Sequence, residues 1–161
     1  MKLLTCTFLL VISSLGSLGQ DPSSEYRIVI DKKEFSLVLF KGKEKVRQYA
    51  VCVGKNPGNK MKVGDTRTPE GEFTISKIQN SKGWMHDFKD GKGSIAGAYG
   101  PWFFRLLSVS GRSWEGIGIH GTHDPASIGT RASEGCVRLR NEELLELKNF
   151  VTVGTRVSIL P

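Results

Sequence analysis

The chain has 161 residues, of which 39% are hydrophobic and 24% are charged, and this composition is typical of one compact globular domain. Its formal net charge is +7. The basic residues are spread along the chain without a cluster, so the sequence argues against a nucleic-acid partner.

The first nineteen residues are predicted to be a secretory signal peptide. Lys2 gives a positive start, residues 3–15 are mostly apolar, and small residues precede Gln20, where we expect cleavage. The apolar stretch is too short to span a membrane, so we expect no stable membrane insertion after cleavage. The domain is therefore predicted to comprise residues 20–161 and to be exported to the periplasm or cell wall, where a basic protein suits an anionic polymer.

Most of the mature chain alternates apolar and polar residues with a period of two, which predicts strands. The turn at residues 41–44 joins two of these strands as a hairpin. Residues 54–68 carry Gly and Pro and predict a long loop, and residues 79–97 show no period and predict an exposed excursion. The predicted strands cover residues 26–30, 35–40, 46–53, 72–78, 98–107, 115–120 and 155–160.

One helix is evident near the C-terminus. Asn141 can cap its N-terminus, and two glutamates follow where the helix dipole favours negative charge. Leu144, Leu147 and Val151 share one face. The sequence thus predicts a single, mainly β domain with one clear helix.

His120 and Cys136 are the residues with the most evident chemistry. They stand 16 positions apart, each beside a glycine, Gly121 or Gly135. A thiol is a strong nucleophile only as thiolate, and a nearby imidazole can accept its proton. Glycine frees backbone N–H groups to face an oxyanion, and Arg138 offers a cation for a carboxylate. The pattern predicts cysteine acyl transfer or hydrolysis on a carboxylate-bearing substrate.

Two other interpretations of these residues remain. Cys52 lies in an apolar segment and is expected to act as a small hydrophobe, although it could pair with Cys136 in a disulfide. His120, His123 and Cys136 could bind zinc, but residues three apart on a strand or loop usually point in different directions. We therefore expect no metal and no cofactor, and we expect His123 and His86 at the surface, His86 near a substrate groove.

Two separated motifs resemble the L,D-transpeptidase catalytic domain, also called the YkuD-type domain. The resemblance covers roughly residues 26–160 and implies a mixed β-sandwich with the active site at one end. It rests on Gly64–Phe73, with its Thr-Pro and Gly-x-Phe elements, and on His120–Thr122, Ile128–Gly129, Ser133–Leu139 and Asn141.

The resemblance implies cleavage of peptidoglycan stem peptides between the third residue, at its L-centre, and the fourth, a D-amino acid. Cys136 would be the nucleophile and His120 the base. Backbone at Gly121 would orient the imidazole, and backbone amides at Gly135 and Cys136 would form the oxyanion hole. Arg138 would pair with a stem-peptide carboxylate. Thr122 and Ser133 could bind substrate or support the loop.

Several points stay open from the sequence. Glu134 stands where many family members have histidine, and a carboxylate there would raise the thiol pKa. The acyl group could pass to an amine of a second stem peptide, to an amine-bearing wall-anchored protein, or to water, which would make the protein an L,D-carboxypeptidase. A non-catalytic peptidoglycan-binding module is the alternative from another class. Trp84, Trp102 and Trp114 could fill the core or stack on glycan rings.

Overall fold

The computed structural model describes residues 25–89, 91 and 93–161. The predicted signal peptide lies outside the described residues. No helix within the described ranges is long and apolar enough to cross a membrane. The elements are β1 (Tyr26–Asp31), β2 (Ser36–Lys41), β3 (Glu44–Ala50), β4 (Val53–Gly54), β5 (Gly71–Asn80), β6 (Met85–Asp87), β7 (Ser94–Ala96), β8 (Trp102–Ser108), β9 (Gly118–His120), a 3₁₀ turn (Pro125–Ser127), β10 (Arg131–Ser133), β11 (Val137–Arg138), α1 (Asn141–Lys148) and β12 (Arg156–Leu160).

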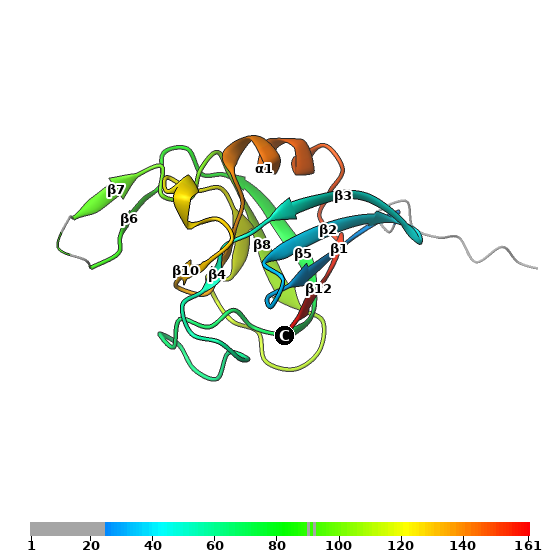
Figure 1. Ribbon diagram of the computed structural model, residues 1–161, viewed down its shortest axis with the longest axis horizontal. Coiled ribbons are helices and arrows are strands. Elements are labelled where there is room, and N and C mark those ends of the chain that lie inside the picture. Colours follow the sequence, from blue (N-terminus) through cyan, green and yellow to red (C-terminus); the bar gives the residue numbers. More distant parts are fainter. Residues whose placement is uncertain (1–24, 90, 92) are drawn as a thin grey trace, which may run out of the picture.

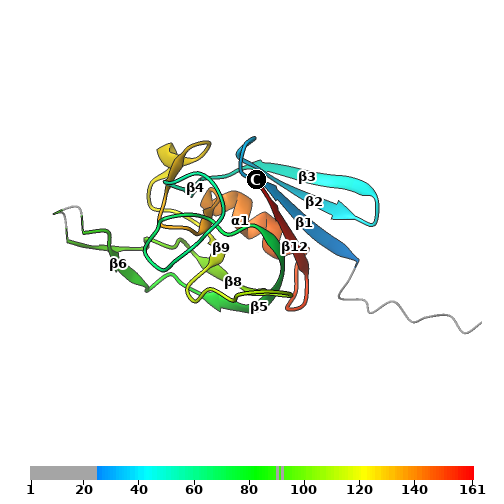
Figure 2. The ribbon, with the colours of Figure 1, turned by 90° about the horizontal axis from the view of Figure 1, so that it is seen from below.

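A mixed eight-stranded sheet forms the body of the domain, with strand order β11-β9-β8-β5-β12-β1-β2-β3. It curls around the core, and α1 packs along one side (Figures 1 and 2). Ile28 and Ile30 of β1 alternate with more exposed neighbours, and Leu37 and Leu39 do the same in β2. Every second side chain of a strand points to one face, so this alternation buries one face of the sheet. The predicted mainly β fold is confirmed.

The curl brings the two edges of the sheet together. β11 is one edge, and the chain that continues from β3, at the other edge, reaches it through Cys52. The Cys52 N–H donates to the Arg138 carbonyl, and the Arg138 N–H donates to the Cys52 carbonyl, both at 2.9 Å. This bridge fixes the backbone two residues after Cys136. Cys52 is fully buried.

The short elements differ most from the sequence predictions. Residues 79–97, expected as an exposed excursion, contain the β6–β7 hairpin. Its strands have three residues each, too few to show a period. The strand expected at 115–120 is limited to β9, and β10 and β11 were not expected at all.

The C-terminal helix has the predicted buried face, but its first residue was misassigned. Asn141 is the first helical residue and Arg140 is the N-cap. Leu144 and Leu147 are fully buried, and Val151 continues the same apolar cluster just beyond the helix. The Asn141 side chain is therefore available for another contact.

Candidate active site

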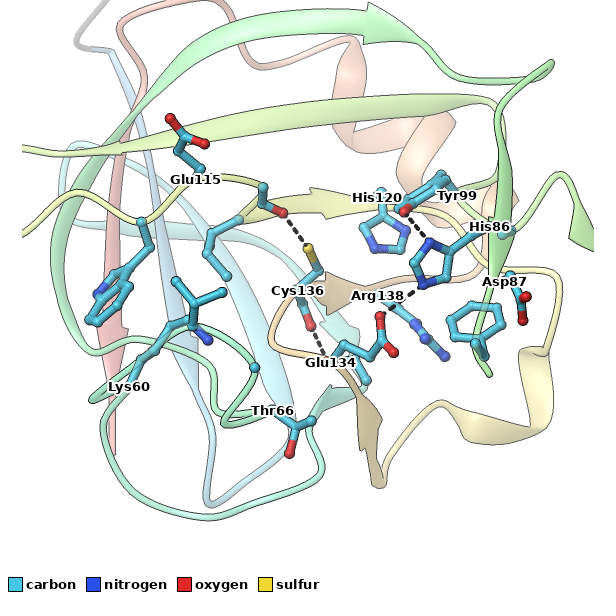
Figure 3. A pocket seen from close by; sticks show the side chains of 18 of the residues that line it. Lys60, Thr66, His86, Asp87, Tyr99, Glu115, His120, Glu134, Cys136 and Arg138 are labelled. Carbon is cyan, nitrogen blue, oxygen red and sulfur yellow. Dashed lines mark hydrogen bonds and ion pairs between the residues drawn. The ribbon is translucent and has the colours of Figure 1, made fainter. Parts of the chain in front are cut away.

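A cavity of about 470 Å³ gathers most of the predicted site residues. His120, Cys136 and Arg138 line it from the β9–β11 edge of the sheet, as Figure 3 shows. The β6–β7 hairpin, through residues 86–89, and the loop before β5, through residues 60–66, form further walls, and residues 98–99 and 114–117 complete the lining.

The pairing of two short strands brings Cys136 to His120. β11 runs parallel to β9, with Val137 opposite Ile119 and Arg138 opposite His120. Cys136 immediately precedes β11 and lies half-buried, and its Sγ–H donates to the Gly116 carbonyl at 3.1 Å. Both Cys136 and Cys52 are free thiols, so the alternative of a disulfide between them is wrong.

The thiol is protonated at neutral pH. Burial raises the pKa of Cys136 to about 11, and the Glu134 carboxylate adds to this rise. A backbone hydrogen bond and the cations of Arg138 and Lys60 oppose it. The sequence-based expectation for Glu134 is thus confirmed in direction, but desolvation is the larger cause.

His120 is buried, 3% exposed, and its ring stacks on Phe103 with centroids 5.3 Å apart and planes 11° apart. Its Nδ1 lies 2.6 Å from the Gly121 carbonyl oxygen, which can only accept, so Nδ1 carries the proton and Nε2 keeps its lone pair. Burial, then the positive charge of Arg138, lowers the pKa of His120 to about 3. The imidazole is therefore neutral and can accept a proton at Nε2.

Within the described residues no hydrogen bond joins His120 to Cys136, because the thiol is turned to Gly116. The two side chains nonetheless line the same cavity. Catalytic hydrogen bonds are often absent or long without substrate, so this geometry is compatible with a nucleophile–base pair.

Gly121 is required by a close approach from the C-terminal helix. The Thr122 N–H donates to Asn141 Oδ1 at 2.9 Å, and a Cβ at Gly121 would overlap that oxygen. Asn141 therefore holds the backbone after His120, and with it the carbonyl that orients the imidazole. The buried Thr122 hydroxyl accepts from the Asp124 N–H at 2.9 Å, which favours loop support over substrate binding.

Ser133 and Gly135 shape the turn before the thiol. Gly135 has φ +133°, and a Cβ there would lie 2.8 Å from the Arg67 carbonyl oxygen. Its N–H donates to Ser133 Oγ at 3.1 Å, and that hydroxyl donates to the Cys136 carbonyl at 2.6 Å. Ser133 is fully buried, so its observed role is to hold the turn. Of the two predicted oxyanion donors, the Gly135 N–H is thus already bonded, whereas no bond from the Cys136 N–H occurs within the described residues.

Arg138 presents an unsatisfied cation. Its side chain is 6% exposed, and its Nε is buried without a hydrogen-bond partner among the described residues. The Phe88 ring from the β6–β7 hairpin lies 5.2 Å from the guanidinium carbon. A buried donor without a partner is costly, so an incoming carboxylate would be stabilised here.

Three residues that line the cavity, His86, Tyr99 and Lys60, come from segments far from Cys136 in the sequence. His86 Nε2 lies 2.8 Å from Glu134 Oε2, and His86 Nδ1 lies 3.0 Å from the Tyr99 hydroxyl. Lys60 is buried and paired with Asp65 at 2.8 Å. His86 is expected from the sequence at the surface near a substrate groove, and it does line this cavity. Tyr99 lies in a predicted strand and Lys60 in a predicted loop, and no local pattern pairs residues so far apart in the chain.

The zinc hypothesis receives no support. No group of three or more His, Cys, Asp or Glu side chains able to hold a metal occurs in the part of the chain that the structure describes. His123 is exposed and packs against Phe88, with ring centroids 5.2 Å apart. The three tryptophans are half-buried, Trp102 and Trp114 against the core and Trp84 against Tyr99 and Phe103.

Residues 25–159 match the family model YkuD, described as the L,D-transpeptidase catalytic domain. The chain belongs to this family. It is 36% identical to the protein YkuD of Bacillus licheniformis over 136 residues, which are 84% of this chain and 66% of that protein. Family members are enzymes, and the family acts on peptidoglycan substrates.

Solved structures share the fold. Bd1075 of Bdellovibrio bacteriovorus superposes with a TM-score of 0.61 and 25% identity, over 85% of this chain and 48% of that one. An L,D-transpeptidase from Mycobacterium smegmatis superposes with a TM-score of 0.63 and 19% identity, over 86% of this chain and 59% of that one. The chain thus spans about two thirds of the curated relative and about half of these structures.

Proposed function

We propose that this protein is a cysteine L,D-transpeptidase. It cleaves stem peptides between the third residue and the D-amino acid at the fourth, and transfers the acyl group from Cys136 to an amine. The observation that carries this proposal is the presence in one cavity of a free thiol, a neutral imidazole with its Nε2 lone pair available, and a guanidinium whose Nε lacks a partner.

The charge state of the pair determines the first step. With a thiol pKa of about 11 and an imidazole pKa of about 3, the resting site holds its proton on sulfur. The proton therefore moves from Sγ to His120 Nε2 as sulfur attacks the carbonyl carbon of the third residue. Stacking on Phe103 and the hydrogen bond to Gly121 hold the imidazole in the required tautomer.

The later steps return that proton. The tetrahedral oxyanion is stabilised by the Cys136 N–H. Its collapse breaks the C–N bond, the departing amine takes the proton from His120, and a thioester remains on Cys136. An acceptor amine then attacks the thioester, His120 takes the amine proton, and the thiol is regenerated when sulfur receives it.

Arg138 is proposed to bind a carboxylate of the stem peptide. Its guanidinium lines the cavity beside the thiol and carries the positive charge that attracts a carboxylate. Peptidoglycan lies outside the cytoplasm, so we also propose that residues 1–19 direct export to the periplasm or cell wall. The acceptor is a stem-peptide amine in the proposed reaction, with a wall-anchored protein as the second amine source.

Mass spectrometry of the products tests the proposal. The mature protein and its Cys136→Ala variant are incubated with disaccharide-tetrapeptide under reducing conditions. We expect a cross-linked dimer lighter by one D-amino acid with the wild type, and none with the variant. Tripeptide alone would identify a carboxypeptidase. Wall binding without any product, in both proteins, would identify a binding module and overturn the enzymatic proposal.

A further inference from the structure

Glu134 places a carboxylate in the turn that ends at Cys136 (residues 133–136, the thiol turn), and this carboxylate has a hydrogen-bond partner. Its Oε2 lies 2.8 Å from His86 Nε2, and a carboxylate can only accept, so Nε2 carries a proton. The partner comes from β6, on the hairpin outside the main sheet. Figure 3 shows Glu134 turned toward His86, on the Arg138 side of the thiol.

The imidazole of His86 has both nitrogens engaged. Its Nδ1 lies 3.0 Å from the Tyr99 hydroxyl, which donates to the neutral ring or accepts from the imidazolium. The Phe88 ring meets the same imidazole edge-on, with centroids 4.5 Å apart. With no nitrogen free, His86 is unsuited to act as a general base, and its geometry is that of a residue that orients its neighbours.

We propose that His86 is a positioning residue whose hydrogen bond holds the Glu134 carboxylate turned away from the Cys136 thiol. The inference rests on the proposed function, since it takes Cys136 as the nucleophile. The imidazole that contacts Glu134 thus reaches it from the β6–β7 hairpin.

The charges around the Cys136 thiol determine in which direction the loss of His86 changes the thiol pKa. The charges that act most on the thiol are those of Arg138, Glu134 and Lys60, and of these three only Glu134 is negative. Asp87 and Glu115 are further carboxylates in the lining of the cavity. Glu134 raises the thiol pKa, so freeing its charge disfavours the thiolate further.

Three other polar or charged side chains lie near the His86 ring. Asp87 is its neighbour on β6 and is exposed, Tyr99 is neutral at pH 7, and the Arg138 guanidinium lies 5.2 Å from the Phe88 ring. Within the described residues, Glu134 is thus the anion bonded to the His86 ring.

The test measures the thiol itself, without substrate. The alkylation rate of Cys136 by iodoacetamide is followed from pH 7 to 10 in the wild type, His86→Ala, Glu134→Gln and the double variant. Peptide mapping separates Cys136 from the buried Cys52. We expect His86→Ala to react about three- to tenfold more slowly at pH 8, since one pKa unit is a tenfold change in thiolate. Glu134→Gln is expected to react at least as fast as the wild type. The double variant is expected to react at the same rate as Glu134→Gln, because the carboxylate is absent from both.

Two further variants sharpen the result. His86→Gln keeps a donor for Glu134 and is expected to lie between the wild type and His86→Ala. His123→Gln removes the exposed imidazole that packs on the other side of Phe88 and is expected to react as the wild type does. A wild-type rate in His86→Ala would overturn the inference, as would a double variant as slow as His86→Ala, because the hairpin would then act only through packing.

The inference and the proposed function fail separately. If the variants do not show the expected alkylation rates while the wild type forms cross-linked dimer, the role of His86 is overturned and the enzymatic proposal stands. A normal alkylation pattern in a protein that forms no product overturns the enzymatic proposal and leaves the effect of His86 on the thiol standing.

Discussion

The cavity has two unlike walls. His120 and Arg138 stand on β9 and β11, where backbone pairing, the Cys52 bridge and Asn141 fix them. His86 and Phe88 come from a hairpin of two three-residue strands that lies outside the main sheet, and they reach the site through side-chain contacts. The groups proposed to react thus stand on the first, rigid wall, whereas the hairpin wall is proposed to adjust charge and shape around them.

The largest expected effect tests the rigid wall. His120→Gln keeps a polar side chain but removes the base, so we expect dimer formation to fall about 10³-fold, within the range for loss of general base catalysis. The measurement is the initial rate of product formation by mass spectrometry. Near-UV circular dichroism of the variant checks the fold. A variant that keeps more than a tenth of the activity would show that another group takes the thiol proton.

The low pKa of His120 also predicts that the free energy of unfolding decreases in acid. Burial lowers the pKa of His120 from 6.5 to about 3 in the folded protein, so between these pH values the unfolded chain binds more protons. The stabilising contribution is fully present above pH 6.5 and is lost as pH falls toward 3. We expect this group to remove up to about 5 kcal/mol over the whole of that window.

Urea unfolding at pH 7 and pH 4 measures that loss. The His120→Gln variant provides the control, because it cannot titrate and should show a smaller decrease between the two pH values. Equal decreases in both proteins would mean that carboxylates, rather than His120, determine the acid sensitivity.

The sequence predicted the rigid wall better than the hairpin wall, and the reason is physical. His120, Cys136 and Arg138 lie within one short stretch, and the connection between them, through the 3₁₀ turn and β10, returns the chain to the parallel neighbour of β9. His86 meets Glu134 across 48 positions, a contact set by the curl of the sheet and the hairpin geometry. The long strands were predicted from their alternation, whereas β6, β7, β10 and β11 have two or three residues and carry no readable period.

The smallest expected effect tests the hairpin wall alone. The Phe88 ring lies 5.2 Å from the buried Arg138 guanidinium, and because Phe88 itself is only half-buried the contact contributes about 0.5–1 kcal/mol. Phe88→Ala should therefore raise KM for the tetrapeptide about two- to fivefold and leave kcat within twofold, since no proton passes through this ring. Steady-state kinetics separate the two constants. A fall in kcat as large as that of His120→Gln would contradict the division between walls, because the hairpin would then position the reacting groups themselves.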